Sequence, residues 1–217
     1  MNMDRAINHE HIFFKTGGIT LEGVLSYPQK SSSCPAVVIC HPHPLYGGDM
    51  NNNVVVGIKG ALQAEGFAIL RFNFRGVTLS EGKYDEGKGE VDDVIAAVNF
   101  LSSQAKVDRD RLFLVGYSFG AWVGLRAALT INALRAVAGI APPCGVYDFN
   151  FLHDSVLPIL LVKGEHDTIC NKKELEIVFD KISSSKEKVV LPQSDHFFSG
   201  REGEVGEEVK RFFSRYL

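Results

Sequence analysis

The sequence has little of what marks several protein classes. Its four cysteines are widely separated and form no CxxC pair, which argues against a disulfide scaffold. No apolar run approaches the roughly 20 residues that a membrane-spanning helix needs, so no membrane partner is expected. Acidic residues outnumber basic ones by only 26 to 23, so the overall charge attracts neither nucleic acid nor an anionic membrane.

Two further absences narrow the range of possible protein classes. The first ten residues carry no apolar stretch of the signal-peptide kind, so we expect a cytoplasmic protein whose cysteines are free thiols. Neither a Walker A sequence nor a G-x-G-x-x-G motif occurs, and no cofactor is predicted. The composition, 45% hydrophobic and 23% charged, is that of an ordinary globular protein, and the length fits a single domain over residues 1–217.

Short apolar runs alternate along the chain with longer segments of helical periodicity. Strands are predicted at Leu21–Tyr27, Ala36–Cys40, Phe67–Phe72, Leu112–Gly116, Ala136–Ile140, Ile159–Lys163 and Lys188–Leu191. Helices are predicted near residues 91–101, 119–129, 175–182 and 205–213, with a fifth after Asn51-Asn52-Asn53, whose amides are placed to cap it. This alternation predicts a three-layer α/β domain around a mostly parallel sheet.

Two segments depart from the alternation. The Gly17-Gly18 turn signal predicts an antiparallel hairpin over Ile12–Tyr27 at one edge of the sheet. The stretch Arg75–Gly89 is rich in glycine and charge and predicts an exposed loop.

The strongest chemical signal is a G-x-S-x-G pentapeptide, Gly116-Tyr117-Ser118-Phe119-Gly120. A buried-strand pattern precedes it and an apolar helical pattern follows, so Ser118 is predicted at a tight strand-to-helix turn. Such a turn strains the backbone by about 1–3 kcal/mol at its apex. The flanking glycines remove side chains that would collide there. The serine hydroxyl is then held at the carboxyl edge of the sheet as a candidate nucleophile.

A serine nucleophile needs a base, and the base needs an acid to orient it. Among the seven histidines, His196 follows the last predicted strand and is expected at the same edge of the sheet. Asp167 follows the strand Ile159–Lys163 and is the preferred acid, with Glu165 and Asp195 as rivals. The order serine, aspartate, histidine is that of the α/β-hydrolases.

With these motifs in this order, the chain resembles a small α/β-hydrolase, close to the dienelactone-hydrolase-like and small bacterial serine esterases. The resemblance covers about residues 21–217. Beside the serine turn and the loops of Asp167 and His196, it rests on His41-Pro42-His43-Pro44 with Gly47-Gly48, and on Arg71-Phe72-Asn73-Phe74-Arg75-Gly76. It implies a three-layer α/β-hydrolase fold. Many relatives read R-G-x-G-x-S after the second block, and here Thr78 replaces a glycine, so that loop is expected to differ in shape.

The resemblance also implies where an oxyanion hole lies. One backbone N–H is expected from Phe119, the residue after the nucleophile, and the other from the loop after strand Ala36–Cys40. Because Pro42 and Pro44 have no N–H, His43 is the first choice and Leu45 the second. Metal binding by His41 and His43 is the rejected alternative, since no third ligand has a suitable spacing, and no metal is predicted.

Aromatic side chains are expected around the mouth of the site. Tyr46, Tyr117 and Phe197 are the candidate substrate-binding residues. Further aromatics near the mouth are Phe149, Phe151 and Phe198, and at least half of the six are expected to pack in the core.

Together these observations predict a serine hydrolase that cleaves small-molecule carboxylic esters through an acyl-enzyme intermediate. The segment between the strands ending at Ile140 and beginning at Ile159 is too short for a large lid domain. An open, short pocket favours short acyl chains. A thioesterase, a lactonase or a peptidase with the same triad is an alternative, and a non-catalytic ligand-binding member of the fold is another. A monomer or a homodimer is expected.

Overall fold

The computed structural model describes residues 8–28 and 33–217, and within them one eight-stranded sheet has the order β1-β2-β4-β3-β5-β6-β7-β8. The strands are β1 (Asn8–Thr16), β2 (Ile19–Tyr27), β3 (Cys34–Cys40), β4 (Ala68–Phe72), β5 (Val107–Tyr117), β6 (Leu134–Ile140), β7 (Ile159–Gly164) and β8 (Lys186–Leu191). From β4 to β8 along the sheet all neighbours are parallel. The seven predicted strands are therefore confirmed.

The predicted hairpin is confirmed at one edge of the sheet. β1 pairs with β2 in antiparallel register, with Thr16 opposite Ile19 across the Gly17-Gly18 turn. Both glycines have positive φ, which a tight turn requires and which other residues adopt only with strain. β2 then pairs antiparallel with β4 and so joins the hairpin to the parallel part of the sheet.

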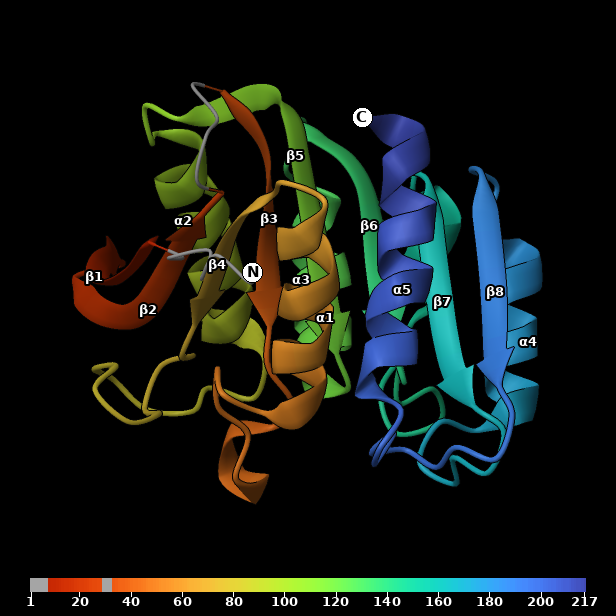
Figure 1. The fold of residues 1–217 in the computed structure, drawn as a ribbon. Coiled ribbons are helices and arrows are strands. Elements are labelled where there is room, and N and C mark those ends of the chain that lie inside the picture. Colours follow the sequence, from red (N-terminus) through yellow and green to blue (C-terminus); the bar gives the residue numbers. More distant parts are fainter. Residues whose placement is uncertain (1–7, 29–32) are drawn as a thin grey trace.

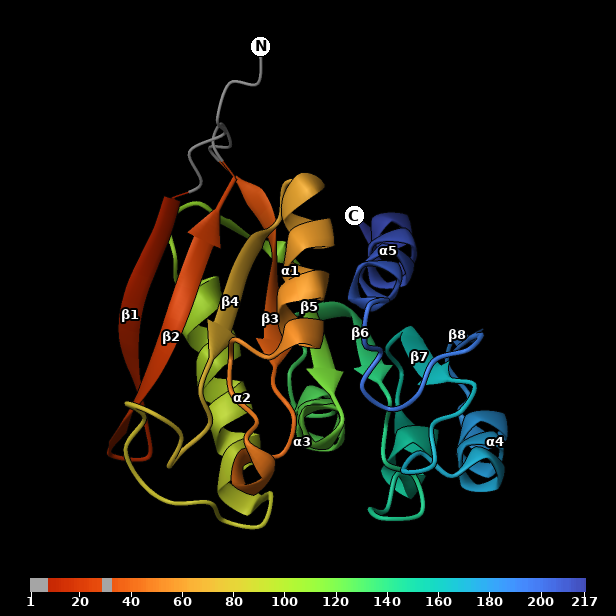
Figure 2. The ribbon, with the colours of Figure 1, turned by 60° about the horizontal axis from the view of Figure 1, so that its bottom comes forward.

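Helices cover both faces of the sheet (Figures 1 and 2). The five α-helices of the described residues are α1 (Asn53–Ala64), α2 (Lys88–Ser102), α3 (Phe119–Ala128), α4 (Lys172–Lys181) and α5 (Glu202–Phe213). α1 and α5 pack on one face, and α2, α3 and α4 on the other. The predicted cap of α1 is confirmed, because the Asn52 side chain accepts a hydrogen bond from the N–H of Val54.

The core is two apolar layers, one on each face of the sheet. One layer includes Val94 of α2 and Leu175 of α4, and the other includes Val54 of α1 and Val205 of α5. Strand β3 contributes to both layers, since alternate side chains point to opposite faces and all seven residues are buried. All four cysteines are buried free thiols, as expected.

The carboxyl ends of the parallel strands meet at the lower edge of the molecule in Figure 1, where the long loops gather. Between β6 and β7 the only regular element of this described segment is the short 3₁₀ helix Asn150–Asp154, so the predicted absence of a large lid there is confirmed. No helix of the described ranges is long and apolar enough to cross a membrane. The predicted loop Arg75–Gly89 is two residues shorter than expected, since Lys88 and Gly89 already belong to α2.

Candidate active site

Ser118 lies at a sharp turn between β5 and α3. Its φ is +54°, in the left-handed region where a side chain strains the backbone. A Cβ at position 116 would come within 2.1 Å of the Gly120 carbonyl oxygen, and one at position 120 within 2.5 Å of the His41 carbonyl oxygen. The turn can therefore be this tight only because both flanking residues are glycine, as the pentapeptide predicts.

The structure brings Ser118, His196 and Asp167 together at the carboxyl edge of the sheet. The Nε2 atom of His196 lies 2.9 Å from Ser118 Oγ, and its Nδ1 lies 2.9 Å from Asp167 Oδ2. The three residues follow β5, β8 and β7, so strands distant in sequence supply one hydrogen-bonded chain. Because the carboxylate accepts the Nδ1 proton, Nε2 is left to accept the serine proton.

Asp167 is held as a carboxylate in a buried position. Burial alone would raise its pKa, but hydrogen bonds from the His196 ring and from the backbone N–H groups of Cys170 and Ile169 outweigh burial and lower the pKa. The rival carboxylates point elsewhere. Glu165 accepts the N–H of Gln193, and Asp195 accepts the N–H groups of Phe197 and Phe198.

The two preferred oxyanion residues both line the cavity beside Ser118, and their side chains are in contact. Phe119 is the first residue of α3, whose N–H has no acceptor within the helix. His43 precedes the 3₁₀ helix Pro44–Tyr46, and its ring lies 4.9 Å from the ring of Phe119. Leu45, the second choice, is unsuitable because its N–H donates to His43 Nδ1 at 3.2 Å.

His41 is fully buried and uses both ring nitrogens inside the protein. Its Nδ1 lies 2.6 Å from the Pro42 carbonyl oxygen, and its Nε2 accepts the N–H of Phe74 at 3.0 Å. It thereby ties the loop after β3 to the end of β4. Burial lowers the pKa of His41 to about 4, so the ring is neutral at pH 7.

The buried His41 predicts a loss of stability in mild acid. The unfolded chain takes up a proton near the ordinary pKa of 6.5, whereas the folded chain does so only near 4, so the free energy of unfolding falls as pH decreases. We expect this residue to remove about 3 kcal/mol between pH 7 and pH 4. Urea denaturation across that range measures the slope. A His41→Asn variant with the same slope as the wild type would contradict the prediction.

A cavity of about 310 Å³ opens beside Ser118. The predicted substrate-binding residues Tyr46, Tyr117 and Phe197 all line it. Tyr46 is 86% exposed at the mouth, whereas Tyr117 is buried and its hydroxyl donates to the carbonyl oxygen of His196 at 3.1 Å. Tyr117 thus contacts the backbone of the candidate base as well as the cavity.

Sequence reasoning missed part of the lining and placed some aromatics correctly in the core. Val146, Tyr147 and Ile169 also line the cavity, from loops that carry no recognisable motif. Their only signal is that they follow β6 and β7 at the edge where the site forms. Phe149 and Phe198 are buried in the core and Phe151 packs against it, in line with the expectation for at least half of the six aromatics.

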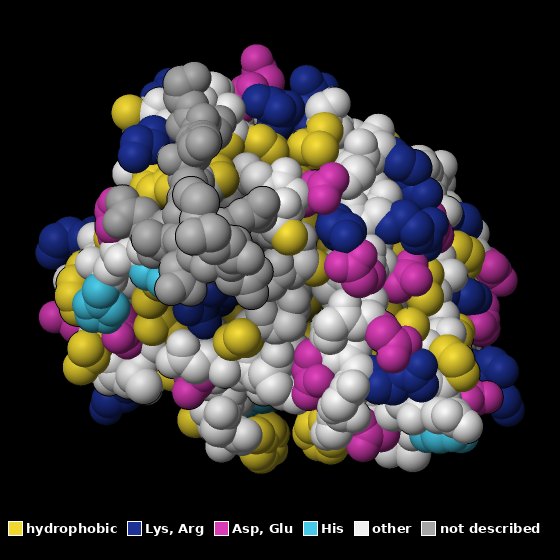
Figure 3. Space-filling view, in the orientation of Figure 1, with side chains coloured by type: hydrophobic (Ala, Val, Ile, Leu, Met, Phe, Trp, Pro, Cys, Tyr) yellow, Lys and Arg dark blue, Asp and Glu magenta, His cyan; other side chains and the backbone are white. Residues whose placement is uncertain are grey.

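The side chains that line the cavity are mostly apolar. In the part of the chain that the structure describes, no Asp, Glu, Lys or Arg lines the cavity. Hydrophobic side chains are exposed at the lower edge of the molecule, where the site loops project (Figure 3). Exposed apolar residues of these loops are Leu45, Tyr46, Val146, Ile169 and Phe197.

Comparison with known proteins extends these observations. The family model of the X-Pro dipeptidyl-peptidases (S15 family) matches residues 17–157, which include Ser118 but neither Asp167 nor His196. An uncharacterised protein from Rickettsia prowazekii is 32% identical over 190 residues, covering 84% of this chain and 79% of that protein.

Solved structures of other bacterial proteins match this one over almost the whole chain. A protein of unknown function from Agrobacterium tumefaciens superposes with a TM-score of 0.87 at 31% identity, covering 95% of each chain. An α/β serine hydrolase without a lid from Xanthomonas campestris superposes with a TM-score of 0.86 at 29% identity, covering 97% of this chain and 95% of that one. The expectation of a small lidless α/β-hydrolase is confirmed, and the chain belongs to the X-Pro dipeptidyl-peptidase (S15) family of serine hydrolases.

Proposed function

We propose that this serine hydrolase cleaves small, uncharged carboxylic esters with short acyl chains. The observation that carries the proposal is the hydrogen-bonded chain Ser118–His196–Asp167 at the floor of an uncharged cavity. A cavity of about 310 Å³ is at the lower end of the range for small-molecule sites, which suits a short acyl group.

In the proposed reaction Ser118 Oγ attacks the ester carbonyl carbon while His196 Nε2 accepts the hydroxyl proton. Asp167 stabilises the imidazolium that forms. The N–H groups of His43 and Phe119 donate to the developing oxyanion, and losing one such donor costs about 3–4 kcal/mol of transition-state stabilisation. His196 then protonates the departing alcohol. Water, activated by the same ring, hydrolyses the acyl group from Ser118 and restores the enzyme.

A peptidase is the second candidate, because the family model is that of dipeptidyl-peptidases. An enzyme that removes a dipeptide from an amino terminus has to hold a protonated amino group near the scissile bond. Holding that charge away from water without a carboxylate partner is costly. Since no described carboxylate lines the cavity, an uncharged ester fits the site better than a peptide amino terminus.

A panel of chromogenic substrates tests the proposal. We expect the largest kcat/KM on p-nitrophenyl acetate or butyrate, a lower value on p-nitrophenyl dodecanoate and little hydrolysis of Gly-Pro-p-nitroanilide. Thioesters and lactones of the same acyl size complete the panel. Faster cleavage of the Gly-Pro anilide than of the acetate would replace the esterase proposal by the peptidase one.

A further inference from the structure

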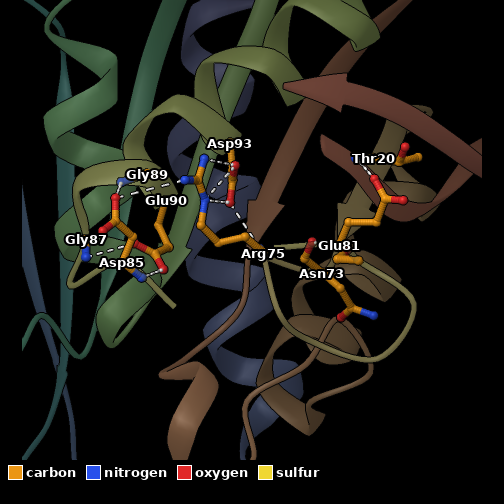
Figure 4. Close-up of polar contacts among 10 residues, drawn as sticks. Thr20, Asn73, Arg75, Glu81, Asp85, Gly87, Gly89, Glu90 and Asp93 are labelled. Atoms are coloured by element: carbon orange, nitrogen blue, oxygen red, sulfur yellow. Dashed lines mark hydrogen bonds and ion pairs between the residues drawn. The ribbon is translucent and has the colours of Figure 1, made fainter. Parts of the chain in front are cut away.

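The loop between β4 and α2, residues 73–87, is fixed at both of its ends (Figure 4). At its start, the Arg75 guanidinium binds the buried carboxylate of Asp93, with Nη2 2.7 Å from Oδ1 and Nε within 3.2 Å of both oxygens. The N–H of Arg75 donates to the same carboxylate at 3.0 Å. Gly89 leaves room for this pair, since a Cβ there would lie 1.7 Å from Arg75 Nη1.

The far end of the loop is fixed by Glu90 of α2. Its carboxylate accepts the N–H groups of Asp85 and Gly87, each at 2.8 Å, and Asp85 in turn accepts the N–H of Gly89 at 3.0 Å (Figure 4). Gly87 has a φ of +85°, and a Cβ there would lie 2.3 Å from the Trp122 ring. The segment before Gly87 therefore has little freedom to move.

Tyr84 directly precedes Asp85, the first residue held by Glu90, and contacts both oxyanion residues. Its ring centroid is 5.0 Å from that of His43 and 5.8 Å from that of Phe119. Its hydroxyl lies 3.3 Å from His43 Nε2. Tyr84 is absent from the cavity lining, so it touches the residues of the oxyanion hole rather than the space for substrate.

The hydrogen bonds around the His43 ring show which of its two nitrogens carries the proton. The Nδ1 atom accepts the N–H of Leu45, so the ring proton is on Nε2 and is donated to the Tyr84 hydroxyl oxygen. Burial raises the pKa of Tyr84 to about 12, so its hydroxyl keeps its proton and accepts from Nε2 through the oxygen. His43 is thus held in one tautomer and one orientation between its own turn and the anchored loop.

We infer that Tyr84 is a positioning residue that fixes the distance between the His43 and Phe119 N–H groups. The loop of residues 73–87, held by Asp93 and Glu90, keeps the Tyr84 ring in place. The inference rests on the proposed function in that it takes these N–H groups as the oxyanion hole. An error of about 1 Å in such a geometry costs about 10² in rate, because hydrogen bonds to the transition state are lost while substrate binding is not.

The test compares Tyr84→Phe, which removes the hydrogen bond to His43 but keeps the ring, with Tyr84→Ala, which removes both. We expect kcat on p-nitrophenyl acetate to fall about 10-fold and about 100-fold, respectively, with KM within about threefold of wild type. Tyr216→Phe is the matched control, since its hydroxyl bonds Ser185 far from the site, and wild-type kcat is expected there. Thermal unfolding of each variant separates lost activity from lost fold.

The rate of phosphonylation by a fluorophosphonate gives a second readout that needs no carboxylic ester. It is expected to fall in the same order, because the phosphoryl oxygen occupies the same oxyanion hole. A wild-type rate in Tyr84→Phe would overturn the role of the hydroxyl, and wild-type kcat and labelling in both variants would overturn the inference. Labelling of the wild type without ester hydrolysis would instead count against the proposed substrate, and the labelling comparison would still decide the role of Tyr84.

Discussion

Replacing Ser118 by alanine is expected to lower kcat on p-nitrophenyl acetate by about 10⁴–10⁶. An alanine side chain has no oxygen for His196 to deprotonate, so no acyl-enzyme can form. The fold should persist, because the serine side chain does not set the left-handed backbone at this position. The glycines at 116 and 120 allow that backbone, and a hydrogen bond from the Ser118 N–H to the Ile140 carbonyl oxygen holds it. Steady-state kinetics with circular dichroism as the check on folding measures the effect.

A control for this substitution is Ser103→Ala. Ser103 follows α2, and its hydroxyl donates to the Phe100 carbonyl oxygen, away from the site. Wild-type turnover is expected in this variant. Turnover within tenfold of wild type in Ser118→Ala would show that the esterase activity does not pass through Ser118.

Replacing Asp167 by asparagine is expected to lower kcat by about 10⁴ while leaving KM nearly unchanged. The backbone N–H groups of Ile169 and Cys170 both point at Oδ1, so the amide oxygen of an asparagine has to take that position. Its NH₂ group then faces His196 Nδ1 and donates to it. His196 is forced to carry its proton on Nε2, where it can no longer accept one from Ser118.

Glu165→Gln is the matched control, because Glu165 lies two residues away on the same loop and its side chain bonds Gln193 rather than His196. We expect its kcat to stay within about twofold of wild type. If Asp167→Asn kept wild-type kcat while Glu165→Gln lost it, the assignment of the acid would move to Glu165.

The parts of the fold and site that follow from sequence are those that depend on local chemistry. The strands around Ala36–Cys40 and Leu112–Gly116 are continuous apolar runs, and only a sheet covered on both faces buries such runs. The glycines around Ser118 have a steric reason that the Cβ distances confirm. His196 and Asp167 each follow a strand, and the parallel topology brings such positions to one edge.

The remaining parts depend on contacts between segments that are far apart in sequence. Tyr147 and Ile169 carry no motif, and they line the cavity only because the loops after β6 and β7 fold over the same edge. Nothing in the local sequence around Leu45 shows that its N–H is used by the His43 ring. The same holds for Tyr84, which lies within a stretch that composition alone describes as an exposed loop.

The structure explains how a threonine can stand at position 78, where the R-G-x-G-x-S pattern has glycine. Its φ is +46°, the conformation that glycine adopts without strain. Its hydroxyl donates to the buried carboxylate of Glu22 at 2.7 Å and accepts a hydrogen bond from Asn73. These bonds offset the backbone strain. Burial alone would raise the pKa of Glu22, but hydrogen bonds from His11, Thr78 and Asn73 hold it at about 2.

The most direct test of the central claim is mass spectrometry of the wild-type protein after reaction with a fluorophosphonate. The probe reacts only with a serine whose hydroxyl has an effective general base, which is what the 2.9 Å contact with His196 provides. The account predicts one phosphonyl group per chain, on Ser118, and none after His196→Ala substitution. An unlabelled Ser118 in the folded wild-type protein, or equal labelling after loss of His196, would contradict it.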